Sequence, residues 1–258
     1  MKMENLKISI VQADMVWENA LANRRKYDDA LADITESELI IFPEMFTTGF
    51  SMRPEMHYEP MNGPSVSWMQ EVAQQKNAAV LGSLIVEENK QFFNRAVWVF
   101  PNGDLEIYDK RHLFTMGQEP EHYSPGRTKS IIHFKGWKIC PLICYDLRFP
   151  VWARNTDDYD LLIYMANWPS SRHHVWKNLL VARAIENQCY CAGVNRCGTD
   201  GNGLNYRGNS ALVSPKGMPH FLGEQEEIKS FDLSYSELHN FRMKFPVLND
   251  RDSFQWAT

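Results

Sequence analysis

Residues 138–150, Lys-Ile-Cys-Pro-Leu-Ile-Cys-Tyr-Asp-Leu-Arg-Phe-Pro, constrain the fold more than any other part of the chain. The apolar run at 139–143 is typical of a buried strand, and the segment after it is typical of a helix start. Cys144 lies between the two, at the carboxyl end of the predicted strand. A side chain on such a turn is held rigidly while its tip stays open, which is why nucleophiles recur there. The stretch therefore predicts a strand-turn-helix unit with one thiol at its exit.

Cys144 needs partners before a role as nucleophile is favoured, since a cysteine in an apolar strand is usually a small buried hydrophobe. Two candidate partners lie upstream, each at the end of an apolar run. Glu44 directly follows the run Leu-Ile-Ile-Phe-Pro, and Lys110 ends the run Glu-Ile-Tyr-Asp-Lys. An acid, a base and a thiol at three strand exits form the set that a cysteine hydrolase requires.

Strands and helices alternate along the rest of the chain, which predicts a mixed sheet with helices on its outer faces. Turns at 87–90 and 101–104 are hairpin signals, so part of the sheet should be locally antiparallel. No repeat and no linker divides the succession, and we predict one domain over residues 1–258. Helices are expected at 19–33, 65–76, 151–155, 173–187 and 235–243, and strands at 6–12, 39–42, 79–86, 92–100, 105–108, 130–134, 139–143, 160–166, 189–195, 206–214 and 227–233.

Three motifs occur in the order Phe-Pro-Glu44-Met-Phe, Asp-Lys110-Arg-His-Leu and Ile-Cys144-Tyr-Asp-Leu-Arg-Phe-Pro. Together they resemble the Glu-Lys-Cys triad of the nitrilase superfamily of carbon-nitrogen hydrolases, and the match covers essentially the whole chain. The resemblance implies an α/β fold of four layers, an α-β-β-α sandwich with two mixed six-stranded sheets face to face and helices outside both.

Each member of this set has an expected role in amide hydrolysis. Cys144 would attack the carbonyl carbon as a thiolate and form a thioester. Glu44 would take the thiol proton and hand it to the departing nitrogen. Lys110 and the backbone N–H of Tyr145 would hold the oxyanion. Glu119 matches a second glutamate that the family often keeps beside its triad, and a free surface glutamate is the alternative.

Three alternatives compete with a Glu-Lys-Cys hydrolase. A Cys-His pair would need a histidine beside the thiol, but only His112 lies in a matched motif, and its expected role is to brace the loop. Glutamine amidotransferases of the doubly wound type place their cysteine in a glycine-flanked elbow, which Ile-Cys144-Tyr lacks. A binding protein on the same fold would be expected to have lost a catalytic residue, but Glu44, Lys110, Glu119 and Cys144 are all present.

The substrate class follows from a narrower resemblance. Residues 144–155, 166–172 and 182–203 resemble the bacterial omega-amidase branch, whose members hydrolyse the terminal amide of 2-oxoglutaramate or 2-oxosuccinamate. Such a substrate carries a carboxylate, and Arg172 is the candidate clamp for it; a surface arginine is the alternative. A nitrile, an N-carbamoyl compound or a longer aliphatic amide would use the same triad.

Apolar residues near the motifs are candidate walls of the substrate pocket: Phe46, Met116 and Trp168. Phe46 and Phe50 flank a polar loop, and packing that loop down is an equal alternative for them. Arg148 is expected to pair with a carboxylate of the fold or of a dimer partner rather than with substrate.

Composition and charge narrow the class of partner. With 44% hydrophobic and 23% charged residues over 258 positions, the chain suits a globular protein with a substantial core. A net charge of -5 without a large basic cluster predicts small-molecule partners and no nucleic acid. The start lacks the apolar core of a signal peptide, and no run approaches the roughly 18 apolar residues of a membrane helix. We therefore expect a cytoplasmic location and no membrane partner.

The five cysteines are expected to be free thiols, since an odd number without a secretory signal does not suggest a disulfide framework. On a strand, Cys140 and Cys144 would lie about 13 Å apart, and Cys189 and Cys191 about 6 to 7 Å. Neither spacing can chelate zinc locally, where each sulfur lies about 2.3 Å from the ion. We expect no metal and no cofactor.

The C-terminal tail, residues 244–258, is rich in aromatic side chains for a chain end. In related proteins such tails cross to a dimer partner, which implies a homodimer here. Packing of the tail on its own subunit is the alternative. The aromatic residues concerned are Phe245, Phe254 and Trp256.

Overall fold

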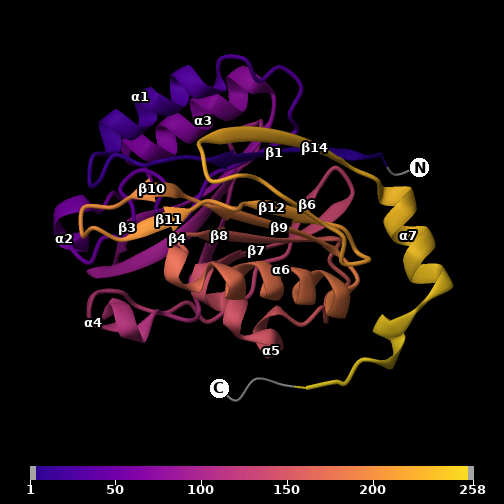
Figure 1. Cartoon of the computed structure of the whole chain (residues 1–258). Helices are drawn as coiled ribbons and strands as arrows, with labels where there is room; N and C mark the ends of the chain where they lie inside the picture. The colour runs from indigo at the N-terminus through magenta and orange to yellow at the C-terminus, as the bar shows by residue number, and fades with distance from the viewer. Residues whose placement is uncertain (1–3, 255–258) are drawn as a thin grey trace.

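The structure is a computed structural model that describes residues 4–254, and two six-stranded sheets form its centre (Figure 1). The strands of the first sheet are β1 (Leu6–Gln12), β2 (Leu39–Ile41), β3 (Ala79–Glu88), β4 (Gln91–Val99), β5 (Leu105–Asp109) and β14 (Glu227–Leu233). Their order is β14-β1-β2-β3-β4-β5. Strands β1, β2 and β3 run parallel. The pairs β3-β4 and β4-β5 are antiparallel, which confirms both predicted hairpins.

The second sheet is also mixed. Its strands are β6 (Ile132–Phe134), β7 (Trp137–Ile143), β8 (Leu161–Ala166), β9 (Tyr190–Asn195), β12 (Ala211–Val213) and β13 (Pro219–Phe221). They lie in the order β13-β12-β9-β8-β7-β6, with β7, β8 and β9 parallel. Strand β8 is buried along its whole length, as its unbroken apolar sequence between two parallel neighbours predicts. A separate two-stranded sheet joins β10 (Cys197–Thr199) and β11 (Asn205–Arg207).

The two six-stranded sheets pack face to face through one apolar core. Ile10 of the first sheet and Leu142 and Ile163 of the second belong to the same cluster of fully buried side chains. At one end, the rings of Trp98 from β4 and Phe134 from β6 meet edge to face with their centroids 5.6 Å apart. The site described below lies where strands of both sheets end.

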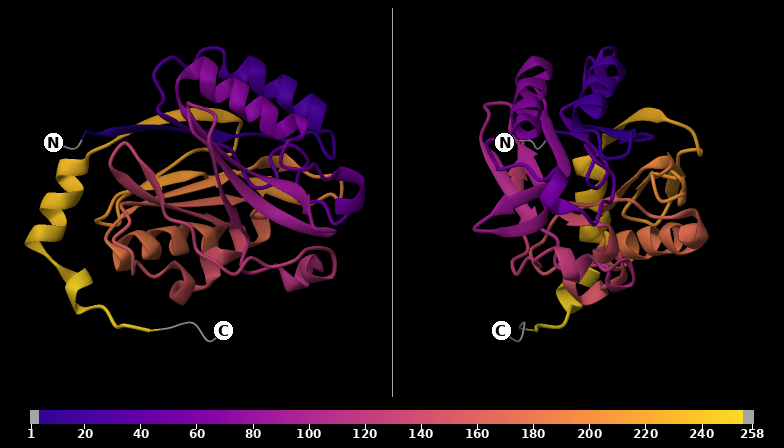
Figure 2. Two further views of the ribbon diagram at one scale, coloured as in Figure 1. Left: turned by 180° about the vertical axis from the view of Figure 1, so that it is seen from behind. Right: turned by 90° about the vertical axis from the view of Figure 1, so that its left-hand side faces the viewer.

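Helices cover the outer face of each sheet (Figures 1 and 2). Helices α1 (Ala20–Leu31) and α3 (Pro64–Lys76) lie over the first sheet, and α6 (His173–Asn187) lies over the second. Asn19 caps α1 by accepting from the N–H of Ala22, as an N-cap asparagine does. These layers form the α-β-β-α sandwich that the resemblance implied. Within residues 4–254, no helix combines the length and apolar character needed to cross a membrane. The other α-helices of the described residues are α2 (Pro54–His57), α4 (Glu119–His122), α5 (Pro150–Ala153) and α7 (Tyr235–Lys244).

The prediction of one strand at 206–214 is wrong. The segment divides into β11 and β12, which belong to different sheets. Between them, Gly208 and Asn209 have φ values of 60° and 51°, in the left-handed region that interrupts a strand. A Cβ on Gly208 would lie 2.3 Å from the side chain of Gln12, so the close approach to β1 requires glycine there. Elements β10, β13, α2 and α4 add to the predicted set.

The described part of the tail has contacts within its own subunit. The side chain of Gln188 donates to the carbonyl oxygen of Phe245 at 2.7 Å. Leu248 is buried, and Arg251 forms an ion pair with Asp158 at 2.6 Å. Figure 2 shows this segment running along the flank of the sandwich after α7. Trp256 lies outside the described residues.

Candidate active site

Four of the predicted residues meet where strands of both sheets end. Glu44 follows β2 and Lys110 follows β5, both in the first sheet. Cys144 follows β7 in the second sheet. All three line one cavity, and Glu119, the first residue of α4, hydrogen-bonds Lys110. Because the two sheets pack face to face, side chains that are far apart in the sequence lie close together.

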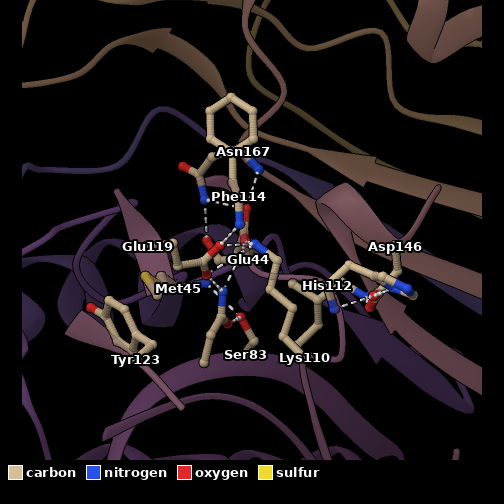
Figure 3. Close-up of polar contacts among 12 residues, drawn as sticks. Glu44, Met45, Ser83, Lys110, His112, Phe114, Glu119, Tyr123, Asp146 and Asn167 are labelled. Atoms are coloured by element: carbon tan, nitrogen blue, oxygen red, sulfur yellow. Dashed lines mark hydrogen bonds and ion pairs between the residues drawn. The ribbon is translucent and has the colours of Figure 1, made fainter. Parts of the chain in front are cut away.

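Lys110 is the cation of a fully buried cluster with Glu44 and Glu119 (Figure 3). Its Nζ lies 2.7 Å from Glu44 Oε1 and 3.0 and 2.9 Å from Oε1 and Oε2 of Glu119. Burial alone would lower the pKa of Lys110, but the carboxylates of Glu119 and Glu44 outweigh it and raise that pKa. Burial also raises the pKa of Glu119, against the opposing charge of Lys110. Lys110 is therefore a fixed positive charge within the site.

The two oxygens of Glu44 have different hydrogen-bond partners. Oε1 accepts two short bonds, from Lys110 Nζ at 2.7 Å and from Asn94 Nδ2 at 2.8 Å. Oε2 accepts one short bond, from the backbone N–H of Asn167 at 2.8 Å, and a longer one from its Nδ2 at 3.4 Å. A carboxylate oxygen has about two lone-pair sites, so Oε2 keeps the greater capacity for a further proton.

Cys144 is a neutral thiol held beside this carboxylate. Burial raises the pKa of the Cys144 thiol well above its usual value, and Glu44 adds to the rise by charge and by a hydrogen bond. Lys110 acts in the opposite direction. A neutral thiol next to a carboxylate acceptor can pass its proton to that acceptor as the sulfur bonds to an electrophile. The arrangement therefore supplies a thiolate at the moment of attack.

The turn that carries Cys144 is anchored by Asp146. Cys144 has a φ of 42°, a strained conformation for a residue with a Cβ. Asp146 Oδ2 accepts from the N–H of Ile143 at 3.0 Å and from the hydroxyl of Tyr108 at 2.7 Å. Its Oδ1 accepts from the N–H of His112 at 3.0 Å and lies 2.8 Å from His112 Nδ1 (Figure 3). The prediction that His112 braces its loop is confirmed, and this use of Nδ1 disfavours a Cys-His pair.

The site opens into a cavity of about 310 Å³. Trp168, Arg172 and Met116 line it as predicted, with Met116 83% exposed at the surface. Tyr145 follows Cys144 in the same turn, so its backbone N–H lies next to the thiol-bearing residue. Further lining residues that the sequence did not suggest are Met52, Phe114, Asp200, Asn202, Leu204 and Tyr206.

Phe46 was wrongly predicted as a wall of this cavity. Its side chain is fully buried and stacks on Phe42, with ring centroids 4.7 Å apart, in the cluster between the first sheet and its helices. Met45 has a left-handed φ of 45°, so the backbone turns between Glu44 and Phe46. The two side chains therefore point in different directions. Phe50, at the other end of the loop, lines the cavity instead.

Two guanidinium groups face the cavity without an ion pair to any described residue. The Cζ of Arg172 lies 5.3 Å from the ring centroid of Phe114, and that of Arg148 lies 5.2 Å from the ring centroid of Trp168. Both arginines line the cavity. The expectation that Arg148 pairs with a carboxylate of its own fold is therefore wrong for the described residues. Cationic groups held over aromatic rings are available to an anionic ligand.

Sequence reasoning missed two asparagines that hold Glu44. Asn94 lies in the middle of β4, and Asn167 follows β8 directly. Each carried a usable signal: a strongly polar residue within a predicted buried strand, and a polar residue at a strand exit. Asn167 also donates from Nδ2 to the backbone oxygen of Glu44 at 2.6 Å, which ties the second sheet to the first.

The cysteines are free thiols, as predicted. Cys144 is half-buried, and the remaining four are buried. Among residues 4–254, no group of three or more histidine, cysteine, aspartate or glutamate side chains is arranged to hold a metal ion. The four buried thiols are Cys140, Cys189, Cys191 and Cys197.

The chain is similar to characterised proteins over nearly its full length. Residues 7–236 match the family model described as carbon-nitrogen hydrolase. Omega-amidase YafV of Escherichia coli strain K12 is 45% identical over 255 residues, which are 98% of this chain and 99% of that protein. The 2-oxoglutaramate amidase of Bacillus subtilis is 30% identical over 250 residues, 94% and 96% of the two chains. XC1258 of Xanthomonas campestris, a CN-hydrolase superfamily protein with an arsenic adduct in its active site, has a TM-score of 0.97 at 43% identity, covering 99% and 100%.

Proposed function

Because this chain belongs to the carbon-nitrogen hydrolase family, we propose that it hydrolyses the terminal amide of a small carboxylate-bearing substrate to the acid and ammonia. Compounds such as 2-oxoglutaramate and 2-oxosuccinamate fit this description. One observation carries the proposal: a cavity of about 310 Å³ holds Cys144, Glu44 and Lys110 together with the guanidinium of Arg172, which has no ion pair within residues 4–254. Relatives named omega-amidase and 2-oxoglutaramate amidase support it.

The first half-reaction forms a thioester on Cys144. The thiol proton moves to Glu44 Oε2 as Sγ bonds to the amide carbon. The negative charge that develops on the amide oxygen is stabilised by Lys110 Nζ and the backbone N–H of Tyr145. Glu44 then returns the proton to the nitrogen, the carbon-nitrogen bond breaks, and ammonia leaves. The fixed charge of Lys110 requires no reorganisation at this step.

The second half-reaction releases the acid. A water molecule gives a proton to Glu44 while its oxygen bonds to the thioester carbon, and the same donors stabilise the oxyanion. The carbon-sulfur bond breaks as the proton returns from Glu44 to the sulfur. The protein is then a neutral thiol beside a carboxylate again, which is the state described by the raised pKa of Cys144.

A panel of substrates tests the proposal. We expect ammonia release to be fastest from 2-oxoglutaramate and 2-oxosuccinamate, compared with a nitrile, an N-carbamoyl amino acid and an uncharged aliphatic amide. A preference for the nitrile or the N-carbamoyl compound would remove the substrate assignment while the family stands. No release from any member of the panel would favour a binding protein on the same fold.

Replacing Arg172 by methionine should impair recognition of the carboxylate. We expect KM for 2-oxoglutaramate to rise about 10- to 100-fold with little change in kcat, because a charge-assisted hydrogen bond is lost away from the reacting atoms. An uncharged amide of similar length should be hydrolysed equally by the variant and the wild type. Arg127→Met, on the exposed surface outside the cavity lining, is the matched control. An equal loss for both substrates would contradict the role.

We also propose that the chain is one domain that works as a cytoplasmic homodimer. A single apolar cluster containing residues of both sheets supports one domain. Exposed apolar side chains beside the tail suit a subunit contact. Free thiols suit a reducing compartment. Two such apolar residues are Met243, directly before the tail, and Phe245, within it.

A further inference from the structure

Asn94 contacts three of the four residues of the proposed site. Its side chain is fully buried on β4. Nδ2 donates to Glu44 Oε1 at 2.8 Å and to Glu119 Oε1 at 3.2 Å. Its backbone oxygen accepts from the N–H of Lys110 at 3.0 Å. One amide group therefore bridges the two carboxylates that share the single cation.

The orientation of that amide is fixed by Ser83 on the neighbouring strand β3. The N–H of Met45 donates to Ser83 Oγ at 2.8 Å, and Ser83 Oγ donates to Asn94 Oδ1 at 2.9 Å (Figure 3 shows Met45 and Ser83 beside Glu44). The carboxylate oxygens of Glu44 and Glu119 accept from the NH2 group, and the hydroxyl of Ser83 completes this orientation by donating to Oδ1. A flipped amide would place Oδ1 against two carboxylates and leave Ser83 facing an NH2 group.

Bridging by an NH2 group has an electrostatic consequence. Two buried carboxylates beside one lysine leave an excess negative charge, which favours protonation of one of them. A donor shared between Glu44 and Glu119 stabilises the ionised form of both. It also occupies Glu44 Oε1, so that Oε2 is the oxygen left for the proton of Cys144.

We propose that Asn94, oriented by Ser83, is a positioning residue that holds Oε1 of Glu44 and directs its Oε2 to the thiol of Cys144. The inference rests on the proposed function for the identity of the reaction, but the proton transfer that it describes does not depend on the substrate. It can therefore be measured on the thiol itself, by the rate at which iodoacetamide alkylates Cys144.

Asn94→Asp tests the proposal because it keeps the shape of the side chain and exchanges the donor for a third acceptor. We expect the acid limb of the alkylation rate to move to higher pH, since a third carboxylate beside Glu44 and Glu119 adds negative charge and favours a protonated cluster, which cannot take the thiol proton. At about pH 7 the rate should fall about 10- to 100-fold. Alkylation is followed by intact-protein mass spectrometry, with Glu44→Gln as the reference in which this limb is absent.

Ser83→Ala removes the hydroxyl that holds the Asn94 amide and changes no charge. We expect the acid limb to move to higher pH by less than in Asn94→Asp. Asn178→Asp, the same exchange on the exposed face of α6, should leave the profile unchanged. A folded Asn94→Asp protein with the wild-type profile overturns the proposal; if that variant does not fold, an unchanged profile in Ser83→Ala overturns it. Shifted profiles in a protein that hydrolyses none of the tested amides would overturn only the proposed function.

Discussion

Cys144→Ala should lower amide hydrolysis by about 10,000-fold or more, because no other group can form the thioester. The measurement is ammonia release from 2-oxoglutaramate under saturating conditions. Substrate binding should persist, since the cavity walls and Arg172 are untouched, and calorimetric titration with the substrate checks this. Brief mixing of the wild type with substrate, followed by acid quenching, should show a covalent mass increase that the variant lacks.

The matched control for this prediction is Cys191→Ala, which removes a buried thiol from β9. We expect it to retain activity close to that of the wild type. Hydrolysis by Cys144→Ala at more than a small percentage of the wild-type rate would remove the sulfur from the mechanism. Loss of activity in both variants would show that the assay reports stability rather than nucleophilic attack.

Lys110→Met should abolish activity and also weaken the fold. The substitution removes the only cation of a fully buried cluster and leaves Glu44 and Glu119 facing each other. Breaking a buried ion pair in this way costs about 3 to 5 kcal/mol of unfolding free energy. Loss of one oxyanion donor costs a further barrier of about 2.7 to 4 kcal/mol in catalysis. Urea unfolding and ammonia release measure the two effects separately.

The stability deficit of Lys110→Met should depend on pH. Protonation neutralises the uncompensated carboxylates, so the deficit should be smaller at about pH 5 than at about pH 8. Lys110→Met/Glu119→Gln removes one of the two charges and should recover part of the stability while activity stays absent. A deficit that does not change with pH would contradict the electrostatic explanation, and full activity of the single variant would contradict the role of Lys110.

Local pattern was sufficient for the elements that carry the site. Helix α6 was predicted with the bounds that the structure has, because its apolar residues recur at helical spacing and bury Trp176, Leu180 and Ala184. Glu44, Lys110 and Cys144 were each found as the reactive residue after an apolar strand, a rule that needs no tertiary information. The family resemblance then predicted that there are two sheets and that they pack face to face.

Local pattern failed where a single backbone angle or a distant neighbour decided the outcome. Phe46 and Phe50 flank the same polar loop, and the sequence does not distinguish them. The left-handed turn at Met45 buries Phe46, and only Phe50 lines the cavity. The break between β11 and β12 depends on the approach of Gly208 to Gln12, from the opposite end of the chain. Neither feature has a periodic signal.

The sequence by itself determined which residues are chemically able to attack, accept a proton and stabilise charge, because strand periodicity and residue type are local properties. Only the tertiary structure decided how those groups are oriented. The two oxygens of Glu44 differ in their hydrogen-bond donors. Asn94 of the first sheet donates to Oε1, and Asn167, at the end of a strand of the second sheet, donates to Oε2. Hydrogen bonds between facing sheets form only when both sheets pack on a common core, and no local pattern in the chain encodes their direction.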